Sequence, residues 1–293
     1  MNNTQKYYFI VNPVSGKGKG AGLGKRLERK LTTVSLDYQI VYTEAPGHAE
    51  VLARNAAEKS DIIVTVGGDG TLNEVINGMH GSGKTAAIIP VGTGNDFVRA
   101  MKISTDFEEA FALLLRGKRK KIDIGRANER LFHNGLGIGF DAMVVEKGLH
   151  VKYLRGNAFY LYSVLAVLFS YKPVEIELSA DDFKGKNDYF LITAANGVSL
   201  GGGFYLTPDA LMDDGYFDIC LIENMSKPAI LKNLLKVYSG KHKYDPRVDI
   251  IRAKKVRLSS ADGFAAHMDG ELISLKINEL NVEILERSLE FIV

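Results

Sequence analysis

The sequence predicts an α/β portion followed by a β-rich portion, and two patterns support this prediction. Short apolar runs typical of strands alternate with helical patterns up to about residue 125. After that point, runs typical of strands follow one another with few helical patterns between them. Alternation is typical of a parallel sheet covered by helices, and a series of strands is typical of a separate β domain. The length of 293 residues is sufficient for two domains.

Strands of the first portion are expected where β-branched and aromatic residues cluster. They are residues 7–11, 38–42, 61–66, 86–91 and 121–124. Helices are expected between them, at residues 22–31, 50–59, 71–80 and 106–115. In a parallel sheet the loops after the strands emerge at one edge, where open α/β folds bind their ligands.

The second portion is expected to form strands over residues 174–180, 188–194, 216–222, 255–259, 272–277 and 281–285. Helices are expected over residues 157–169 and 228–239. We place residues 1–125 in the first domain and residues 126–286 in the second. A final strand over residues 287–293 is compatible with packing back on the first domain.

Composition excludes several classes of protein. The 37 Lys and Arg residues nearly balance the 35 Asp and Glu residues, so no overall charge attracts nucleic acid. The single cysteine, Cys220, excludes an intrachain disulfide and a cysteine-rich zinc site. The first six residues are polar, which makes a cytoplasmic location the default. The longest apolar stretch, residues 158–171, is too short to span a membrane and predicts either a buried helix or one bordering a lipid site.

Three glycine-rich loops follow strands of the first portion. They read Asn12-Pro13-Val14-Ser15-Gly16-Lys17-Gly18, Gly67-Gly68-Asp69-Gly70-Thr71 and Gly92-Thr93-Gly94-Asn95-Asp96. Because glycine has no Cβ, backbone N–H groups in such loops approach phosphate oxygens closely. The helix expected to begin at Thr71 adds free N–H donors and the positive end of its dipole. We therefore expect one polyphosphate site, with Lys17 supplying a positive charge.

Asp69 and Asp96 lie in loops that should face these phosphates. A carboxylate beside a polyanion repels it unless a cation lies between them, so the pattern predicts magnesium bound together with a substrate. The alternative is that both aspartates satisfy backbone N–H groups where helices begin. Thr71 and Glu74 also fit the capping box of a helix.

Together these loops resemble the diacylglycerol kinase catalytic domain, and the soluble bacterial diacylglycerol and lipid kinases in particular. The resemblance rests on Gly67-Gly68-Asp69-Gly70-Thr71-x-Asn73-Glu74 and, more specifically, on Gly92-Thr93-x-Asn95-Asp96-Phe97, because NAD kinases share the first motif. Asp213-Asp214-Gly215 and Asp269-Gly270-Glu271 match the same family. The resemblance implies a Rossmann-like nucleotide domain followed by a β-sandwich domain, with the active site in the cleft between them.

The resemblance also implies roles for individual residues. Glu271 matches a catalytic base, whereas the residues alone are equally consistent with a solvated strand end, and we place Asp69 and Asp96 with it in the catalytic set. Asp214, with the backbone carbonyls of Leu211 and Tyr216, matches a magnesium site, and Lys17, Asp123 and Asp214 match a charge network between metal and ATP. The positions that match nucleotide contacts are Asn12, Ser15, Gly16, Lys17, Thr43, Gly67, Gly68, Asp69, Gly70, Thr71, Asn73 and Thr93.

The function predicted from all of this is an ATP-dependent lipid kinase that uses Mg²⁺ and acts on a lipid at the membrane surface, foremost diacylglycerol. An NAD kinase-like enzyme and a non-catalytic lipid- or nucleotide-binding module are the alternatives. The basic residues 118–121 suit either a helix C-terminus or contact with anionic lipid headgroups. A nucleic acid partner is not expected, and homodimer formation is left open.

Overall fold

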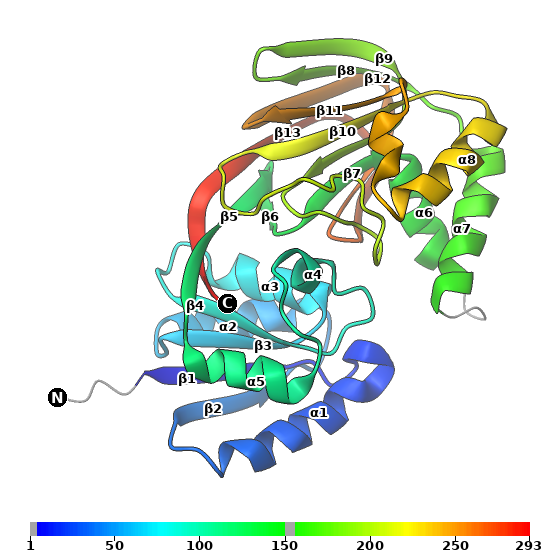
Figure 1. Cartoon of the computed structure of the whole chain (residues 1–293). Helices are drawn as coiled ribbons and strands as arrows, with labels where there is room; N and C mark the ends of the chain where they lie inside the picture. The colour runs from blue at the N-terminus through cyan, green and yellow to red at the C-terminus, as the bar shows by residue number, and fades with distance from the viewer. Residues whose placement is uncertain (1–4, 150–155) are drawn as a thin grey trace. The chain divides into compact units, whose positions relative to one another are not determined.

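The computed structural model describes residues 5–149 and 156–293. The chain divides into two compact units, which we describe separately. Unit 1 consists of Met1–Ile124 together with Glu286–Val293, and unit 2 is Gly125–Leu285. Helices and a large sheet occur together (Figure 1), so the predicted mixed α/β class is confirmed.

Unit 1 alternates strands and helices. Its elements are β1 (Lys6–Val11), α1 (Ser15–Leu31), β2 (Asp37–Tyr42), α2 (His48–Ala57), β3 (Ile62–Gly67), α3 (Asp69–Met79), β4 (Thr85–Pro90), α4 (Asp96–Ala100), α5 (Phe107–Arg116), most of β5 (Arg119–Ala127) and the end of β13 (Glu271–Ile292). The strands pair in parallel in the order β2-β1-β3-β4-β13. Such pairing places the loops after β1, β3 and β4 at the same edge.

The core of unit 1 forms because β3 and β4 are mostly apolar and are buried along their whole length, as expected of strands covered on both faces. Helices α1 and α5 contribute Leu27, Leu31, Phe107 and Phe111 to one hydrophobic cluster with alternate residues of the strands. Helices α2 and α3 pack against each other and against strands β1 and β3. The helices hold the strand ends, and therefore the glycine loops, in place.

Unit 2 is mostly antiparallel. Its elements are β6 (Arg130–Phe132), β7 (Gly135–Gly139), α6 (Phe140–Leu149), α7 (Gly156–Ser170), β8 (Glu175–Ala180), β9 (Phe183–Ala195), β10 (Phe217–Glu223), α8 (Lys227–Val237), the 3₁₀ helix η1 (Lys241–Tyr244), β11 (Val248–Ala253), β12 (Lys255–Met268) and most of β13. The strand order β11-β10-β9-β7-β12-β13 is complemented by β8, which pairs with both β9 and β12. Inward side chains of these strands, such as Phe132, Ile192, Phe217 and Leu258, form one hydrophobic core.

Several elements differ from the sequence predictions. The predicted strands 272–277 and 281–285 and the final strand are one continuous strand, β13, whose last residues pair with β4 in unit 1. Helix α6 and strand β7 were not predicted. Strand β7 contains Gly135, Gly137 and Gly139, which local propensity disfavours in strands. A Cβ on these glycines would lie within 3.0 Å of the side chains of Leu200, Asp141 and Tyr171, so packing requires glycine there.

Helix α7 covers the predicted helix 157–169, and its side chains are described from Tyr162 onward. No helix in the described ranges 5–149 and 156–293 is long and apolar enough to cross a membrane.

Candidate active site

Three side chains from two loops of unit 1 lie together where β1 and β3 end. The amide nitrogen of Asn12 donates to Oγ1 of the buried Thr71 at 2.8 Å. The hydroxyl of Ser15 lies 3.4 Å from the same Oγ1 atom. Asn12 also accepts a hydrogen bond from the N–H of Val14 through its Oδ1 atom. These bonds tie the loop after β1 to the first turn of α3.

The backbone of the first loop is left-handed over consecutive residues. The φ angles of Gly16, Lys17 and Gly18 are 60°, 62° and 89°. A Cβ on Gly16 would lie 2.0 Å from the carbonyl oxygen of Val91, so only glycine allows the loop to approach the end of β4. Consecutive backbone N–H groups in such a conformation form a concave binding surface for anions. The side chain of Lys17 is exposed at this loop.

The loops after β3 and β4 also meet. Helix α3 begins at Asp69, and its N-cap residue Gly68 makes no side-chain capping bond. A Cβ on Gly68 would lie 3.0 Å from Cα of Gly92. Gly67 is equally restricted, because a Cβ there would lie 2.7 Å from Cβ of Thr71. The start of α3, including Gly70, therefore presents backbone N–H groups beside the residues around Thr93, which is itself exposed.

The acidic residues of these loops have protein partners. The carboxylate of Asp69 accepts hydrogen bonds from the N–H groups of Asp96 at 3.2 Å and Phe97 at 3.3 Å, at the start of α4. The carboxylate of Asp96 forms an ion pair with Arg99 at 2.6 Å. Both negative charges are thus balanced beside the expected phosphate site, Asp69 by backbone donors and Asp96 by a guanidinium group.

Glu74 does not form the predicted capping box. Its carboxylate accepts hydrogen bonds from Gly47 N–H at 2.9 Å and Ala49 N–H at 3.0 Å, and so it caps the beginning of α2. Helix α3 begins at Asp69, which places Thr71 inside its first turn instead of at its N-cap. The prediction was wrong because the beginning of the helix was placed two residues too late.

Three further predicted residues of unit 1 are buried at strand ends or in helices. The N–H of Thr43 donates to the carbonyl of Val11 at 2.9 Å. The side-chain oxygen of Asn73 accepts a hydrogen bond from Asn77 at 3.0 Å. Asp123 is fully buried and accepts the N–H of Arg287 at 2.6 Å. The predicted network of Lys17, Asp123 and Asp214 stays a prediction.

In unit 2, Glu271 is exposed and is the first residue of β13, directly after a tight hairpin turn. Asp269 and Gly270 form this turn with φ angles of 48° and 84°, which is typical of a two-residue hairpin. The carboxylate of Asp269 is buried and accepts three backbone hydrogen bonds of 2.9–3.0 Å, from His133, Asn134 and Gly135. Asp269 therefore anchors the turn that carries Glu271 to β7 and to the loop before it.

The predicted metal ligand Asp214 has protein partners at both of its carboxylate oxygens. Its Oδ1 atom accepts the N–H of Tyr216 at 3.2 Å, and its Oδ2 atom forms an ion pair with Arg252. Leu211 is exposed. Burial raises the pKa of the next acidic residue, Asp218, to about 6. Across the residues that the structure describes, no three His, Cys, Asp or Glu side chains gather as a metal site requires. Arg252 occupies the Asp214 carboxylate in this arrangement, and the magnesium site at Asp214 stays a prediction.

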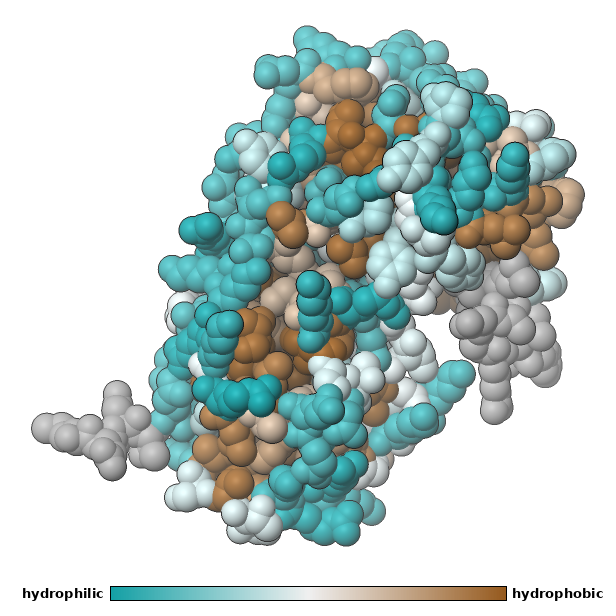
Figure 2. Space-filling model, in the orientation of Figure 1, coloured by the Kyte–Doolittle hydropathy of each residue, from teal (hydrophilic) through white to brown (hydrophobic). Residues whose placement is uncertain are grey.

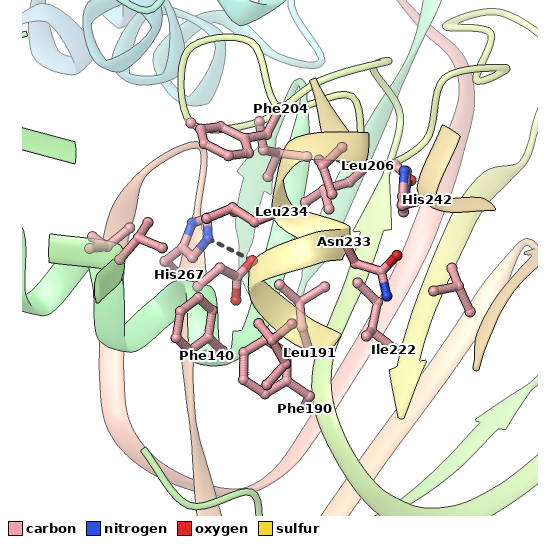
Figure 3. A pocket seen from close by; sticks show the side chains of 18 of the residues that line it. Phe140, Phe190, Leu191, Phe204, Leu206, Ile222, Asn233, Leu234, His242 and His267 are labelled. Carbon is pink, nitrogen blue, oxygen red and sulfur yellow. Dashed lines mark hydrogen bonds and ion pairs between the residues drawn. The ribbon is translucent and has the colours of Figure 1, made fainter. Parts of the chain in front are cut away.

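Unit 2 also contains a deep apolar pocket (Figure 3). About 910 Å³ of space is free of protein atoms there, including open solvent at the mouth. Apolar side chains from α6, α7, α8, β9 and β10 line it, among them Phe140, Val164, Phe190, Ile222 and Leu234. Its polar lining includes Asp141, Asn233, His242, His267 and Gly270. The pocket therefore extends to the turn that carries Glu271.

The sequence reasoning missed Asp141, His267 and Asp269 as site residues. Nε2 of His267 lies 3.2 Å from Oδ2 of Asp141, an interaction drawn as a dashed line in Figure 3. The two residues are 126 positions apart, and no local pattern indicates such a pair. Asp269 was seen only as part of a turn, because its partners lie in β7 and the loop before it.

Known protein families match both parts of the chain. The family of the diacylglycerol kinase catalytic domain matches residues 6–127, and the YegS C-terminal NAD kinase beta sandwich-like domain matches residues 135–290. A diacylglycerol kinase of Staphylococcus saprophyticus is 32% identical over 269 residues, which are 90% of this chain and 88% of that protein. The chain belongs to the bacterial diacylglycerol kinase family.

Other members of the diacylglycerol kinase family show similar agreement. The diacylglycerol kinase of Bacillus subtilis is 30% identical over 90% of this chain and 88% of its own length. A crystal structure of a diacylglycerol kinase from Bacillus anthracis matches with a TM-score of 0.81 and 26% identity, and covers all of this chain and 98% of that one. The predicted resemblance is confirmed, and so is the predicted two-part organisation of an α/β region followed by a β-sandwich-like region.

Proposed function

We propose that the protein is an ATP-dependent lipid kinase that transfers the γ-phosphoryl group to the hydroxyl of diacylglycerol, giving phosphatidic acid. Family membership supports a phosphotransferase with an alcohol acceptor and favours it over the NAD kinase-like alternative. The observation that carries the proposal is that the apolar pocket of unit 2 reaches Gly270, the residue directly before Glu271. An acceptor with long apolar chains and one hydroxyl suits an apolar pocket whose lining includes the residue directly before the proposed base.

Unit 1 is proposed as the Rossmann-like nucleotide domain. The N–H groups of residues 15–18, the start of α3 and the loop around Thr93 would bind the triphosphate of ATP. Lys17 is exposed at the left-handed loop and would contribute a cation. The hydrogen bonds of Asp69 and the ion pair of Asp96 with Arg99 keep the two carboxylates from repelling the phosphates.

Glu271 is proposed as the general base. Its carboxylate accepts the proton of the lipid hydroxyl while the hydroxyl oxygen forms a bond to the γ-phosphorus atom. The bond between that phosphorus and the β–γ bridging oxygen breaks, and ADP leaves. Transfer requires that the nucleotide held by unit 1 and the hydroxyl held by unit 2 meet during turnover.

Magnesium is proposed to enter with ATP as part of the substrate, where it neutralises phosphate charge. A structural ion at Asp214 with the carbonyls of Leu211 and Tyr216 stays a prediction. Such an ion would have to displace Arg252 from the Asp214 carboxylate.

Association with a membrane surface is proposed through α7 and α8. Tyr162 and Phe169 of α7 and Leu231 and Leu235 of α8 are exposed, and Lys227 of α8 contacts α7 by donating to the carbonyl of Phe169 at 2.9 Å. Figure 2 shows hydrophobic surface in the region of these helices. Exposed apolar side chains on helices at the rim of a lipid pocket suit insertion between headgroups. Homodimer formation stays a prediction.

A lipid-panel assay tests the proposed function. Purified protein, ATP and magnesium are incubated with vesicles that contain diacylglycerol, phosphatidylglycerol, a sphingoid base and a prenol, with NAD in a parallel reaction. Mass spectrometry is expected to find phosphatidic acid as the main product and no phosphorylated NAD. Formation of phosphorylated NAD, or of no phosphorylated lipid, would contradict the proposal.

A further inference from the structure

The ring of His267 connects two parts of unit 2 that are distant in sequence. Nδ1 of the ring accepts a hydrogen bond from the N–H of Gly270 at 3.3 Å. Nε2 lies 3.2 Å from Oδ2 of Asp141. Asp141 is the second residue of α6, which directly follows β7. Since Nδ1 faces an N–H donor, the ring proton must reside on Nε2, which donates to Asp141. Both residues are buried, so these bonds do not compete with bulk water.

The fold makes space for this pair at one position of the sheet. Gly137 of β7 lies opposite His267 of β12 in the antiparallel register. A Cβ on Gly137 would be 1.9 Å from Oδ2 of Asp141 and 2.4 Å from Nε2 of His267. Any other residue at position 137 would displace the pair. The other oxygen of Asp141 accepts the N–H of Ala142 at 2.9 Å, which fixes the orientation of the carboxylate.

The pair acts on the turn that precedes the proposed base. Asp269 anchors one side of this turn through its three hydrogen bonds to residues 133–135. His267 anchors the other side through Gly270, whose backbone is directly bonded to Glu271. His267, Asp141 and Gly270 also line the apolar pocket, so the turn is held where the pocket ends.

We propose that Asp141 and His267 are positioning residues that hold the Gly270 peptide, and thereby the carboxylate of Glu271, in line with a hydroxyl bound at the end of the apolar pocket. This inference rests on the proposed function, because it assumes that Glu271 accepts the hydroxyl proton. Asp141 fixes the tautomer of His267, and His267 fixes the turn. Neither residue exchanges a proton with the substrate.

Two substitutions at position 267 separate the two hydrogen bonds. In His267→Asn, Oδ1 takes the place of ring Nδ1 and continues to accept the Gly270 N–H. In His267→Gln, the longer side chain reaches Asp141 and leaves the Gly270 N–H without an acceptor. Asp141→Asn places an N–H₂ donor against Nε2–H, which moves the ring proton to Nδ1 and sets it against the Gly270 N–H. Asp181→Asn is the matched control, because Asp181 also has a positive φ in a hairpin turn and accepts two backbone N–H groups.

We expect His267→Gln and Asp141→Asn to lower kcat about tenfold or more while the KM values for ATP and lipid change less than about twofold. Hydrogen exchange of the Gly270 amide should accelerate about tenfold in the same two variants. His267→Asn should keep the wild-type Gly270 exchange and lose less kcat than His267→Gln, and the control Asp181→Asn should keep the wild-type kcat within about threefold and the wild-type Gly270 exchange.

Equal kcat in His267→Gln and His267→Asn, unchanged Gly270 exchange in His267→Gln, or an equal loss in Asp181→Asn would overturn the inference. The exchange measurement does not depend on catalysis. A wild-type protein that phosphorylates no lipid, together with the expected exchange pattern, would therefore reject the proposed function and leave the role of the pair in holding the turn intact.

Discussion

The carboxylate of Asp69 accepts the backbone N–H of Asp96 at 3.2 Å, so an acidic side chain at the end of one strand caps the helix that follows the next strand. The Phe97 N–H adds a second bond to the same carboxylate. Asp69 therefore ties the loop after β3 to the loop after β4. Displacement of this carboxylate would separate the two loops that are proposed to hold the triphosphate.

Asp69→Asn is expected to reduce kcat/KM about 100-fold, because its amide group places a donor against a backbone N–H and separates the two loops that are proposed to position the triphosphate. The free energy of unfolding should fall by about 1 kcal/mol, the usual cost of a lost helix cap. Steady-state kinetics and urea unfolding measure the two effects. Asp106→Asn is the control, since Asp106 caps α5 through two N–H groups of the same unit. If the Asp69 variant keeps full activity, Asp69 has no part in the mechanism.

Gly16→Ala is expected to weaken ATP binding more than Gly18→Ala. Both glycines have a positive φ, so alanine costs about 1–2 kcal/mol of backbone strain at either position. Only at Gly16 would the new Cβ meet the Val91 carbonyl, whereas no atom lies within 4 Å of a Cβ on Gly18. Titration with a non-hydrolysable ATP analogue measures the difference. Equal affinities of the two variants would show that the close approach to Val91 is irrelevant to the nucleotide.

Leu234→Trp is expected to raise the KM for lipid about tenfold without changing the KM for ATP, because the larger ring fills the apolar pocket. Leu115→Trp, at an exposed position of α5, makes the same change outside the pocket. The natural sequence contains no tryptophan, so the emission of each variant reports only its own position. Diacylglycerol vesicles should shift the emission of the Leu234 variant alone. An unchanged lipid KM would exclude this pocket as the acceptor site.

Acid is expected to destabilise unit 2 through His242. Burial lowers the pKa of this imidazole, with its Nε2 donating to the Leu206 carbonyl at 3.1 Å. Because the unfolded chain takes up a proton at about pH 6.5 and the folded chain only at lower pH, the free energy of unfolding falls as the pH drops below about 6.5. His242→Gln keeps a donor for Leu206 and should flatten this dependence in urea unfolding between about pH 7.5 and pH 5. An identical slope in the variant and the wild type would contradict the assignment.

The strand–helix alternation and the three glycine loops were predictable because their signals are local. The contacts among the loops were not, since Asp69 reaches Asp96 only after β3 and β4 have paired in parallel. Strand β7 was missed because its glycines are required by partners such as Leu200 and Tyr171, which no local propensity reflects. Likewise, β13 was divided into pieces because Asn278 resembles a turn residue, whereas it lies within one continuous strand.

The end of β13 also determines when unit 1 can complete its fold. Glu290 and Phe291 pair with Thr85 and Ala86 on β4, and Ile292 is buried in the core of unit 1. During synthesis on a ribosome, residues 1–124 emerge first, yet the strand that covers the edge of β4 is made only after the whole of unit 2. Nascent unit 1 must therefore wait with that edge uncovered until the end of β13 has been synthesised. A chain released early, or a truncated fragment of residues 1–124, would expose this edge to other nascent chains.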